Sequence, residues 1–388
     1  MSRRIGLGGV LAITMASSTF ALPIFGVLGT TLREEFSAAR WQIGILVTVV
    51  TATGALVSPM TGSFADRLAP RHSTALTLVM AGTAFLLMGL SVGYFMLAAV
   101  SILSGVAQAL ANPATNRLIM SQVEAGRRGF LTGIKQAGVQ AGNFLAGILL
   151  PLGAASFLGW RGAVALAAIA PLVGLAILYA ITRGVPRPPL GARGEVARVS
   201  SVVIRLAFYG GCLGFTVGAL QTYLPSYGEE GFGLTTAQAG ALVAVFGLTG
   251  FVTRLSAGPL SERVFGHHRT LAGMAAMTAL AALLLAMAPS GAWLWLAAIL
   301  VGLGPMAWNV VGNLAVMELS PPGAAGRGSG VMMAGFLGGV ALGAPVFGAT
   351  VDLTGTYLPG WIVVAVLGVV ATWLAWGIRE DRVAPVAS

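Results

Sequence analysis

Long apolar stretches recur along the whole chain and are separated by short polar segments. A helix needs about 20 predominantly apolar residues to cross the hydrocarbon core of a bilayer. Only helices and closed β-barrels satisfy their backbone hydrogen bonds there, and the sequence lacks the alternating segments of a barrel. It therefore predicts an all-α membrane protein with twelve transmembrane helices, at about residues 7–32, 41–64, 73–92, 95–118, 130–151, 162–182, 203–225, 237–260, 270–288, 292–317, 328–350 and 360–378.

The composition excludes several classes of protein. Only 9% of the 388 residues are charged, whereas an ordinary soluble domain has about 25%, so neither a soluble enzyme nor a disordered chain fits. The single cysteine, Cys212, rules out an internal disulfide framework and a cysteine-based metal site. The three histidines lie in predicted loops and no phosphate-binding loop occurs. We therefore expect no catalytic site, no metal, no cofactor and no direct use of ATP.

The positive charges are distributed unevenly between the two sides of the predicted bundle. If the N-terminus is cytoplasmic, only Arg33, Arg40 and Arg161 lie on the opposite side, together with the acidic pair Glu229 and Glu230. An excess of arginine in cytoplasmic loops is the usual pattern for proteins of the inner (plasma) membrane. The net charge of +10 is then a result of topology and needs no nucleic-acid partner. Both termini are predicted to be cytoplasmic. The arginines on the cytoplasmic side are Arg3, Arg4, Arg67, Arg71, Arg127, Arg128, Arg183, Arg187, Arg193, Arg198, Arg205, Arg263, Arg269, Arg327, Arg379 and Arg382.

A proline-, glycine- and arginine-rich segment divides the twelve spans into two sets of six. We predict an N-terminal half at residues 1–183, a solvated cytoplasmic linker at 184–200 and a C-terminal half at 201–388. The halves repeat each other, which indicates a duplicated six-helix unit with a binding site between the two copies. The matches are residues 62–67 with 258–263 at an offset of 196, and Gly105, Asn112 and Asn116 with Gly302, Asn309 and Asn313 at an offset of 197.

Two loops carry a family resemblance. The pattern Gly62-x3-Asp66-Arg67-x3-Arg71 resembles the signature loop of the major facilitator superfamily, and Gly258-x3-Glu262-Arg263-x5-Arg269 is its weaker second copy. The resemblance implies two pseudo-symmetric six-helix bundles in which spans one, four, seven and ten line the cavity and span five packs against span eight. It also implies a similarity to the family's organic-anion and cyanate permeases. The residues that it assigns to a cytoplasmic gate are Asp66, Arg67, Arg71, Glu262 and Arg263, to which we add Arg117 as a gate or anchor residue.

The chain departs from the family's proton-driven drug exporters at two places. Those proteins carry an arginine in span four, four residues before a glycine, where this chain has Ser101 before Gly105. They also carry a Gly-Pro signature in span five, whereas residues 138–147 contain no proline. Both departures weaken the assignment to that class.

Polar residues inside the spans are candidates for solute contacts. Asn112 and Asn116 share one helix face, as do Asn309 and Asn313, because residues four apart are neighbours on a helix. Such amides face either a solute path or another helix with which they form hydrogen bonds. Spans three, six, nine and twelve lack interior amides and charges and suit the lipid. The full set of candidate solute-binding residues is Lys135, Arg254, Asn112, Asn116, Gln140, Asn309, Asn313 and Gln221.

Lys135 and Arg254 give the sharpest hypothesis about the solute. Both lie within or near predicted spans, and acidic residues in mid-membrane are nearly missing. A cation inside a membrane protein needs a partner and marks a functional site by default. An anionic solute would supply that partner. The alternatives are that the two side chains snorkel to the interface or form a gate with backbone carbonyls or with Glu318.

These observations favour a secondary active or facilitative transporter that moves a small anion across the inner membrane by alternating access. Protons are a candidate coupling ion, and we expect the chain to act as a monomer. The alternative within the same fold is a proton-coupled multidrug or metabolite efflux transporter. A third reading, from another class, is a membrane sensor or scaffold that has lost transport.

Overall fold

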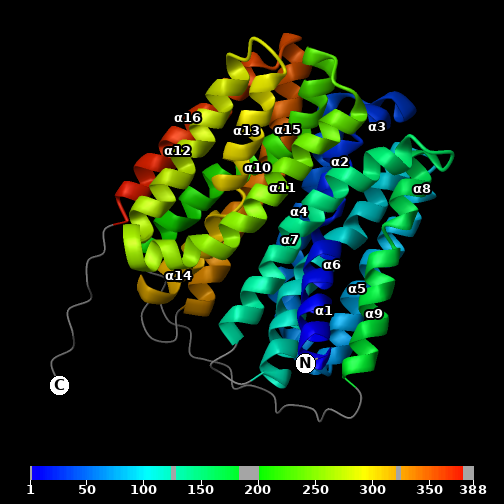
Figure 1. The fold of residues 1–388 in the computed structure, drawn as a ribbon, viewed down its shortest axis with the longest axis vertical. Helices are drawn as coiled ribbons and strands as arrows, with labels where there is room; N and C mark the ends of the chain where they lie inside the picture. The colour runs from blue at the N-terminus through cyan, green and yellow to red at the C-terminus, as the bar shows by residue number, and fades with distance from the viewer. Residues whose placement is uncertain (1, 124–127, 183–200, 320–324, 379–388) are drawn as a thin grey trace.

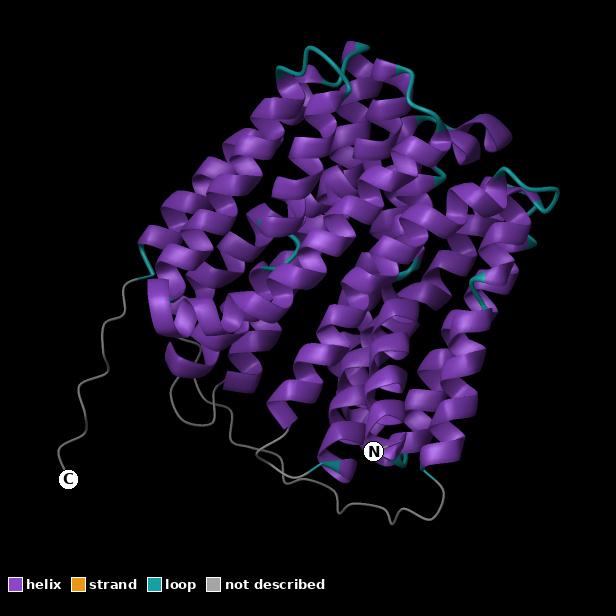
Figure 2. Cartoon of the chain, viewed as in Figure 1, coloured by secondary structure: helices purple, strands orange, loops and turns teal. Residues whose placement is uncertain are grey.

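The computed structural model describes residues 2–123, 128–182, 201–319 and 325–378, and over these it is almost entirely helical (Figures 1 and 2). Figure 2 shows no strand in this part of the chain. Eleven of the described helices are long and apolar enough to cross a bilayer, and α1 with α2 make a twelfth if the bent pair counts as one span. The all-α membrane fold is therefore confirmed. The linker predicted at 184–200 lies outside the described residues.

The described residues of the first half of the chain form nine helices. Their bounds are α1 Ser2–Thr19, α2 Ala21–Val27, α3 Gly29–Phe36, α4 Arg40–Arg67, α5 Pro70–Gly89, α6 Tyr94–Gln122, α7 Arg128–Ala154, α8 Gly159–Leu166 and α9 Ile169–Ile181. In the second half, the part that the structure describes forms seven helices and one π-helical turn. Their bounds are α10 Ser201–Phe232, α11 Thr236–Leu260, η2 Ser261–Phe265, α12 His267–Ala286, α13 Ala292–Leu303, α14 Trp308–Leu319, α15 Ala325–Thr354 and α16 Leu358–Trp376.

Local chemistry sets several of these boundaries. Pro70 begins α5, where its missing N–H costs no helical hydrogen bond. Thr235 caps α11: its hydroxyl accepts from the Gln238 amide while the Gln238 side chain accepts from the Thr235 amide. Gly233, with φ of 65°, turns the chain between α10 and α11 in a conformation that disfavours other residues.

Three predicted spans are broken, where continuous helices were expected. The first span bends by 52° between α1 and α2, next to Phe20. The sixth span is interrupted between α8 and α9. The tenth span is interrupted between Leu303 and Trp308, where α13 ends and α14 begins. Pro305 lies in this break and cannot donate a helical hydrogen bond. The break leaves the Met306 carbonyl available to side chains, which matters for the site described below.

The helices form two groups in space (Figure 1). We call α1–α9 the N-group and α10–α16 the C-group. The main contacts between the groups are α4 along α15 and α7 along α11. The second contact is the one expected between spans five and eight. Glycine permits it: a Cβ on Gly147 would lie 2.3 Å from the Gly240 carbonyl oxygen, and a Cβ on Gly44 would lie 2.5 Å from Pro345 in α15.

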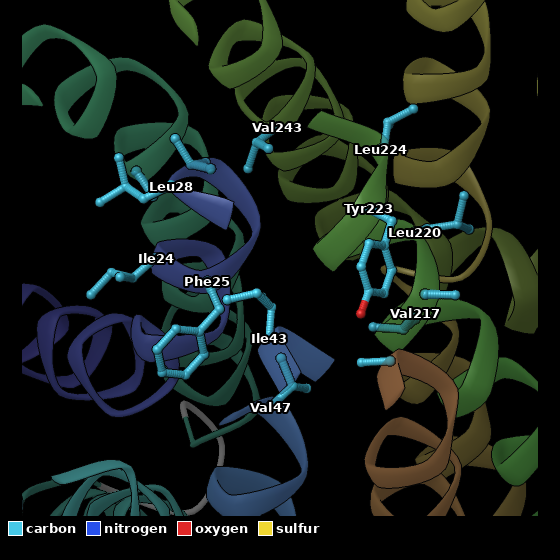
Figure 3. Close-up of a cluster of buried hydrophobic side chains, with 14 of the residues drawn as sticks. Ile24, Phe25, Leu28, Ile43, Val47, Val217, Leu220, Tyr223, Leu224 and Val243 are labelled. Carbon is cyan, nitrogen blue, oxygen red and sulfur yellow. The ribbon is translucent and has the colours of Figure 1, made fainter. Parts of the chain in front are cut away.

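An apolar layer lies between the two groups (Figure 3). Phe25, Ile43 and Val47 of the N-group face Val217 and Tyr223 of the C-group, and none of them is more than 6% exposed. Burial of such side chains stabilises the contact by about 25 cal/mol for each Å² of apolar surface removed from water. We call these five residues the apolar seal.

The helices predicted to face lipid present apolar side chains outward. Val79 in α5, Leu172 in α9, Leu280 in α12 and Val369 in α16 are each 48% exposed or more. These helices belong to spans three, six, nine and twelve, so the polar helices occupy the interior of the bundle, as expected from the distribution of amides.

Candidate functional site

Lys135 lies in α7 and is buried, with 1% of its surface exposed. Its ammonium nitrogen Nζ donates to Asn112 Oδ1 at 3.1 Å, Thr115 Oγ1 at 3.3 Å and Asn116 Oδ1 at 2.5 Å. The three acceptors lie within one turn of α6, at spacings of three and four residues that place them on one helix face. Lys135 therefore joins α7 to α6 within the N-group. We call these four residues the lysine site.

The sequence predicted three members of the lysine site and missed Thr115. Its position between Asn112 and Asn116 was the available signal, because all three share one face of the same helix. The Thr115 hydroxyl donates to the Ala111 carbonyl at 2.6 Å, so its oxygen is oriented to accept from Lys135.

The charge of Lys135 is not neutralised by any described residue. The three oxygens satisfy the hydrogens of the ammonium group, but all three belong to neutral side chains. No ion pair joins Lys135 to a carboxylate in the part of the chain that the structure describes. A buried charge without a counter-ion is costly. The lysine site is thus a place where an anion would gain much more than a neutral solute.

Arg254 in α11 binds backbone carbonyls of both groups. Its Nε donates to the Met306 carbonyl at 2.8 Å, and its Nη1 donates to the Gln136 carbonyl of α7 at 2.7 Å. Glu318, the alternative partner considered from the sequence, instead lies with its carboxylate 2.9 Å from His267 Nε2. Arg254 therefore bridges the N-group and the C-group through neutral acceptors.

A chain of amides also crosses between the groups. Gln221 Nε2 donates to Asn143 Oδ1 at 3.0 Å, and Asn143 Nδ2 donates to Gln140 Oε1 at 2.9 Å. Gln140 Nε2 then donates to the Met306 carbonyl at 3.0 Å. The three side chains are at most 7% exposed. The structure thus places Gln140 and Gln221 in one directed network, and it adds Asn143 and the Met306 carbonyl, which the list of candidates had omitted.

The two asparagine pairs have different surroundings. Asn112 and Asn116 bind Lys135, and Asn116 is exposed although it lies inside a predicted span. In α14, Asn313 Nδ2 donates to the Asn309 carbonyl at 2.7 Å, while the buried Asn309 Oδ1 has no hydrogen-bond partner among the described residues. That the pairs face each other across one cavity stays a prediction.

The gate residues predicted at the cytoplasmic loops show one clear contact between helices. Arg117, at the end of α6, donates from Nη1 to the Leu68 carbonyl between α4 and α5 at 2.8 Å. Arg71 Nε lies 3.1 Å from His72 Nε2. Arg67, Glu262 and Arg263 are exposed, and the side chain of Asp66 lies outside the described part of the chain.

A second charged cluster lies at the opposite end of the bundle, near α3 (Figure 1). Glu230 binds Arg33, Arg40 at Nη2, and the Tyr357 hydroxyl, which donates to Oε2 at 2.9 Å. Arg40 Nη1 also pairs with Asp352 at 3.1 Å. Burial raises the pKa of Tyr357, and the adjacent Glu230 carboxylate raises it further, so this hydroxyl stays protonated and donates. We call these five residues the distal cluster, and sequence reasoning did not find it.

Comparisons with known proteins give a consistent picture. A family model described as Major Facilitator Superfamily matches residues 7–333, and a second match covers 232–388. The "Probable nitrate/nitrite transporter NarK2" of Mycobacterium tuberculosis is 29% identical over 408 residues, 96% of each chain. The "Probable sulfoacetate transporter SauU" of Cupriavidus necator is 26% identical over 378 residues, 87% of this chain and 85% of that protein.

Solved structures show the same fold at low sequence identity. A D-xylose–proton symporter superposes with a TM-score of 0.80 at 16% identity, over 97% of this chain and 98% of that one. A bacterial homologue of the human lysosomal transporter Spinster, in an inward-facing and occupied conformation, superposes with a TM-score of 0.77 at 16% identity, over 96% and 95% of the two chains.

Proposed function

The chain belongs to the Major Facilitator Superfamily of membrane transporters, and from this premise we propose that it moves a small anion across the plasma membrane by alternating access. It is a transporter and not an enzyme.

The lysine site carries the proposal. Lys135 is a buried cation whose three contacts are neutral oxygens, so its charge is available to a solute. An anion that displaces one of these oxygens would accept its hydrogen bond from the ammonium group and cancel the charge, while the Asn112 and Asn116 amide nitrogens supply further donors. A neutral solute gains only the hydrogen bonds. The site therefore favours anions on both electrostatic and hydrogen-bonding grounds.

The similar proteins support an oxygen-rich anion. The names of the two relatives above refer to nitrate, nitrite and sulfoacetate, which all carry negative charge on oxygen. Oxygen atoms of this kind match ammonium, guanidinium and amide donors. We propose an oxyanion or a small sulfonate or carboxylate as the solute class, with Lys135 as its main charged contact and Arg254 as a second contact on the opposite group.

The arrangement of the groups supports an inward-facing conformation. The N-group and the C-group correspond to the two halves proposed from the sequence, and we propose that both termini are cytoplasmic. At the distal end, ion pairs and the apolar seal join the groups. Toward the other end, Asn116 of the lysine site is exposed. We propose that solute reaches Lys135 from the cytoplasmic side in this state and from the distal side after the two groups rock apart there.

The membrane potential opposes the inward movement of an anion, and a co-transported proton would offset this cost. Moving one net negative charge inward against the membrane potential costs about 2.3 kcal/mol per 100 mV. Within the described residues no carboxylate contacts Lys135 or Arg254. We therefore propose that a weak-acid solute such as nitrite or a carboxylate carries any co-transported proton itself, and that a strong-acid anion such as nitrate moves without one at this site.

Uptake into proteoliposomes tests the proposal. The purified protein is reconstituted and given labelled nitrate, nitrite or sulfoacetate, with xylose as a neutral solute and tetraphenylphosphonium as a cation. We expect saturable uptake of at least one anion, no saturable uptake of xylose or the cation, and loss of anion uptake in K135Q. Saturable transport of the cation together with unchanged behaviour of K135Q would favour the efflux alternative and overturn the proposal. A pH gradient of either sign added to the same assay shows whether protons are coupled.

A further inference from the structure

The distal cluster adjoins a cavity of about 1030 Å³ at the end of the bundle near α3. Its lining includes Thr30, Arg33, Arg40, Tyr227, Glu230 and Tyr357. The topology proposed above places this end on the extracytoplasmic side, where the chain has few cationic side chains. Two of those few arginines thus line the first space that an external solute would enter.

The ion pairs of the distal cluster all cross between the two groups. Arg33 and Arg40 belong to α3 and α4 of the N-group, while Glu230 and Asp352 belong to α10 and α15 of the C-group. The Tyr223 hydroxyl of α10 adds a hydrogen bond to the Arg40 carbonyl at 2.7 Å. Separation of α4 from α15 must break these contacts. It would leave two arginines on one wall and two carboxylates on the other.

Both arginines also hold donors that the present contacts leave unused. The Nε atoms of Arg33 and Arg40 are buried and have no hydrogen-bond partner among the described residues. A guanidinium presents five N–H donors in a planar fork that fits two oxygens of one anion. Once the carboxylates move away, each arginine can offer that fork to an anion from outside.

The apolar seal explains why this step must precede transport. Phe25, Ile43 and Val47 pack against Val217 and Tyr223 between the groups (Figure 3), so a charged solute at the distal end has no polar route to Lys135 while the seal is closed. An anion that binds the arginines only when the groups have separated stabilises the open state, because it interacts differently with the two states.

We propose that Arg33 and Arg40 form a capture site for the external anion, and that the anion opens the distal end by taking the place of Glu230 and Asp352. The inference rests on the proposed function, since it needs an anionic solute. The charges favour it: α3, the start of α4 and α8 carry Arg33, Arg40 and Arg161 against Glu34 and Glu35, whereas the facing part of the C-group carries Glu229, Glu230 and Asp352. The wall that would receive the anion is the positive one.

Two variants separate a capture site from a simple latch. R40Q and E230Q both break the Arg40–Glu230 ion pair, but only R40Q removes a cation that would hold the anion. For anion added from the outside, we expect R40Q to raise the KM by tenfold or more, and E230Q to leave it unchanged or lower it. R40K keeps the charge but loses the planar fork, so its KM should lie between those of the wild type and R40Q. If R40Q and E230Q change the external KM alike, the cluster is only a latch and the inference is wrong.

R161Q is the matched control. It removes an arginine from the same end, but Arg161 pairs with Glu35 at 2.8 Å inside the N-group, so neither state of the transporter changes this contact. We expect a wild-type KM. A tenfold effect of R161Q would show that only the general positive potential of this end matters, which would overturn the assignment to Arg33 and Arg40.

A labelling experiment reports on opening independently of transport. Cys212 is replaced by serine, and Val47 in the apolar seal, 2% exposed, is replaced by cysteine. A membrane-impermeant maleimide is then added outside, with nitrate, nitrite or sulfoacetate. We expect at least one anion to speed labelling by threefold or more, and R40Q to label fast with no response to anion. If no anion changes the labelling although anion uptake and its dependence on Lys135 persist, the capture site fails while the proposed function stands. If labelling responds but K135Q transports normally, the proposed lysine site fails and the capture site stands.

Discussion

Replacement of Lys135 by glutamine removes one buried positive charge and little volume. In the structure the ammonium group binds the oxygens of Asn112, Thr115 and Asn116, and a glutamine amide can donate to two of these acceptors. The fold should therefore persist. Because a buried charge without a counter-ion is destabilising, we expect the solute-free K135Q variant to be at least as stable as the wild type.

The effect on anion binding can be estimated from the lost charge. Two unit charges 4 Å apart attract by about 4 kcal/mol at an effective dielectric constant of about 20. The anion must give up part of its hydration, and hydrogen bonds to charged groups contribute about 1.5–3 kcal/mol net. A loss of about 2 kcal/mol corresponds to a Kd about thirtyfold higher, given that each 1.4 kcal/mol is tenfold.

Thermal stability in detergent measures this loss directly. A solute at one hundred times its Kd stabilises the folded state by about 2.7 kcal/mol. At the same concentration, a thirtyfold weaker Kd leaves about 0.9 kcal/mol. We therefore expect the anion-induced rise in Tm to shrink to about one third in K135Q, and the KM for uptake to rise about thirtyfold.

R205Q serves as the control, since Arg205 donates to the Gly377 carbonyl and does not contact the lysine site. It should retain both the anion-induced rise in Tm and the KM. If K135Q binds anion with the wild-type Kd, or if its solute-free form unfolds at a much lower temperature, then Lys135 is a structural residue and the electrostatic reasoning is wrong.

Three further changes test other parts of the structure. G44A puts a Cβ about 2.5 Å from the Pro345 backbone. Overpacking of this kind costs about 1–3 kcal/mol, so we expect the distal end to open more often. Faster labelling of a V47C variant by the external maleimide would show this opening. N143L leaves Gln140 Oε1 without its donor, which should lower the free energy of unfolding by about 1–3 kcal/mol. An unchanged Tm would show that the amide network does not stabilise the fold. R254K keeps the charge but loses the planar fork that binds two carbonyls. We therefore expect anion uptake to fall at least tenfold. Wild-type uptake would show that the positive charge alone is enough for transport.

The sequence predicted the residues of the candidate site better than their contacts. Lys135, Asn112 and Asn116 stand out because charged and amide side chains are rare inside apolar spans. Their union in one site depends on how α6 and α7 are rotated against each other, which periodicity does not specify. Gly138 and Gly142 of α7 lie close to α1: a Cβ on Gly138 would lie 2.4 Å from the Ala12 carbonyl oxygen.

The distal cluster shows what local pattern cannot reveal. Arg40 and Asp352 are 312 residues apart, and Arg40 and Glu230 are 190 apart. Each residue alone is an ordinary charge near the end of a span. Only the packing of α4 against α15 brings them together, and that packing belongs to one conformation of the protein. The Met306 carbonyl is similar, since backbone carbonyls carry no sequence signal. This one is available because the helix is broken here and the Val310 N–H donates to the Ala307 carbonyl instead.

The amino-acid sequence by itself determined that the chain is a helical membrane protein, which helices face lipid, and which rare polar side chains must find partners inside. It could do so because the cost of exposing polar groups to hydrocarbon acts on each span separately. The tertiary structure decided which partners those side chains have: neutral oxygens for Lys135, carbonyls of both groups for Arg254, and carboxylates across the group boundary for Arg33 and Arg40. Those choices depend on distances of a few ångströms between helices far apart in the sequence, and only the packed bundle sets them.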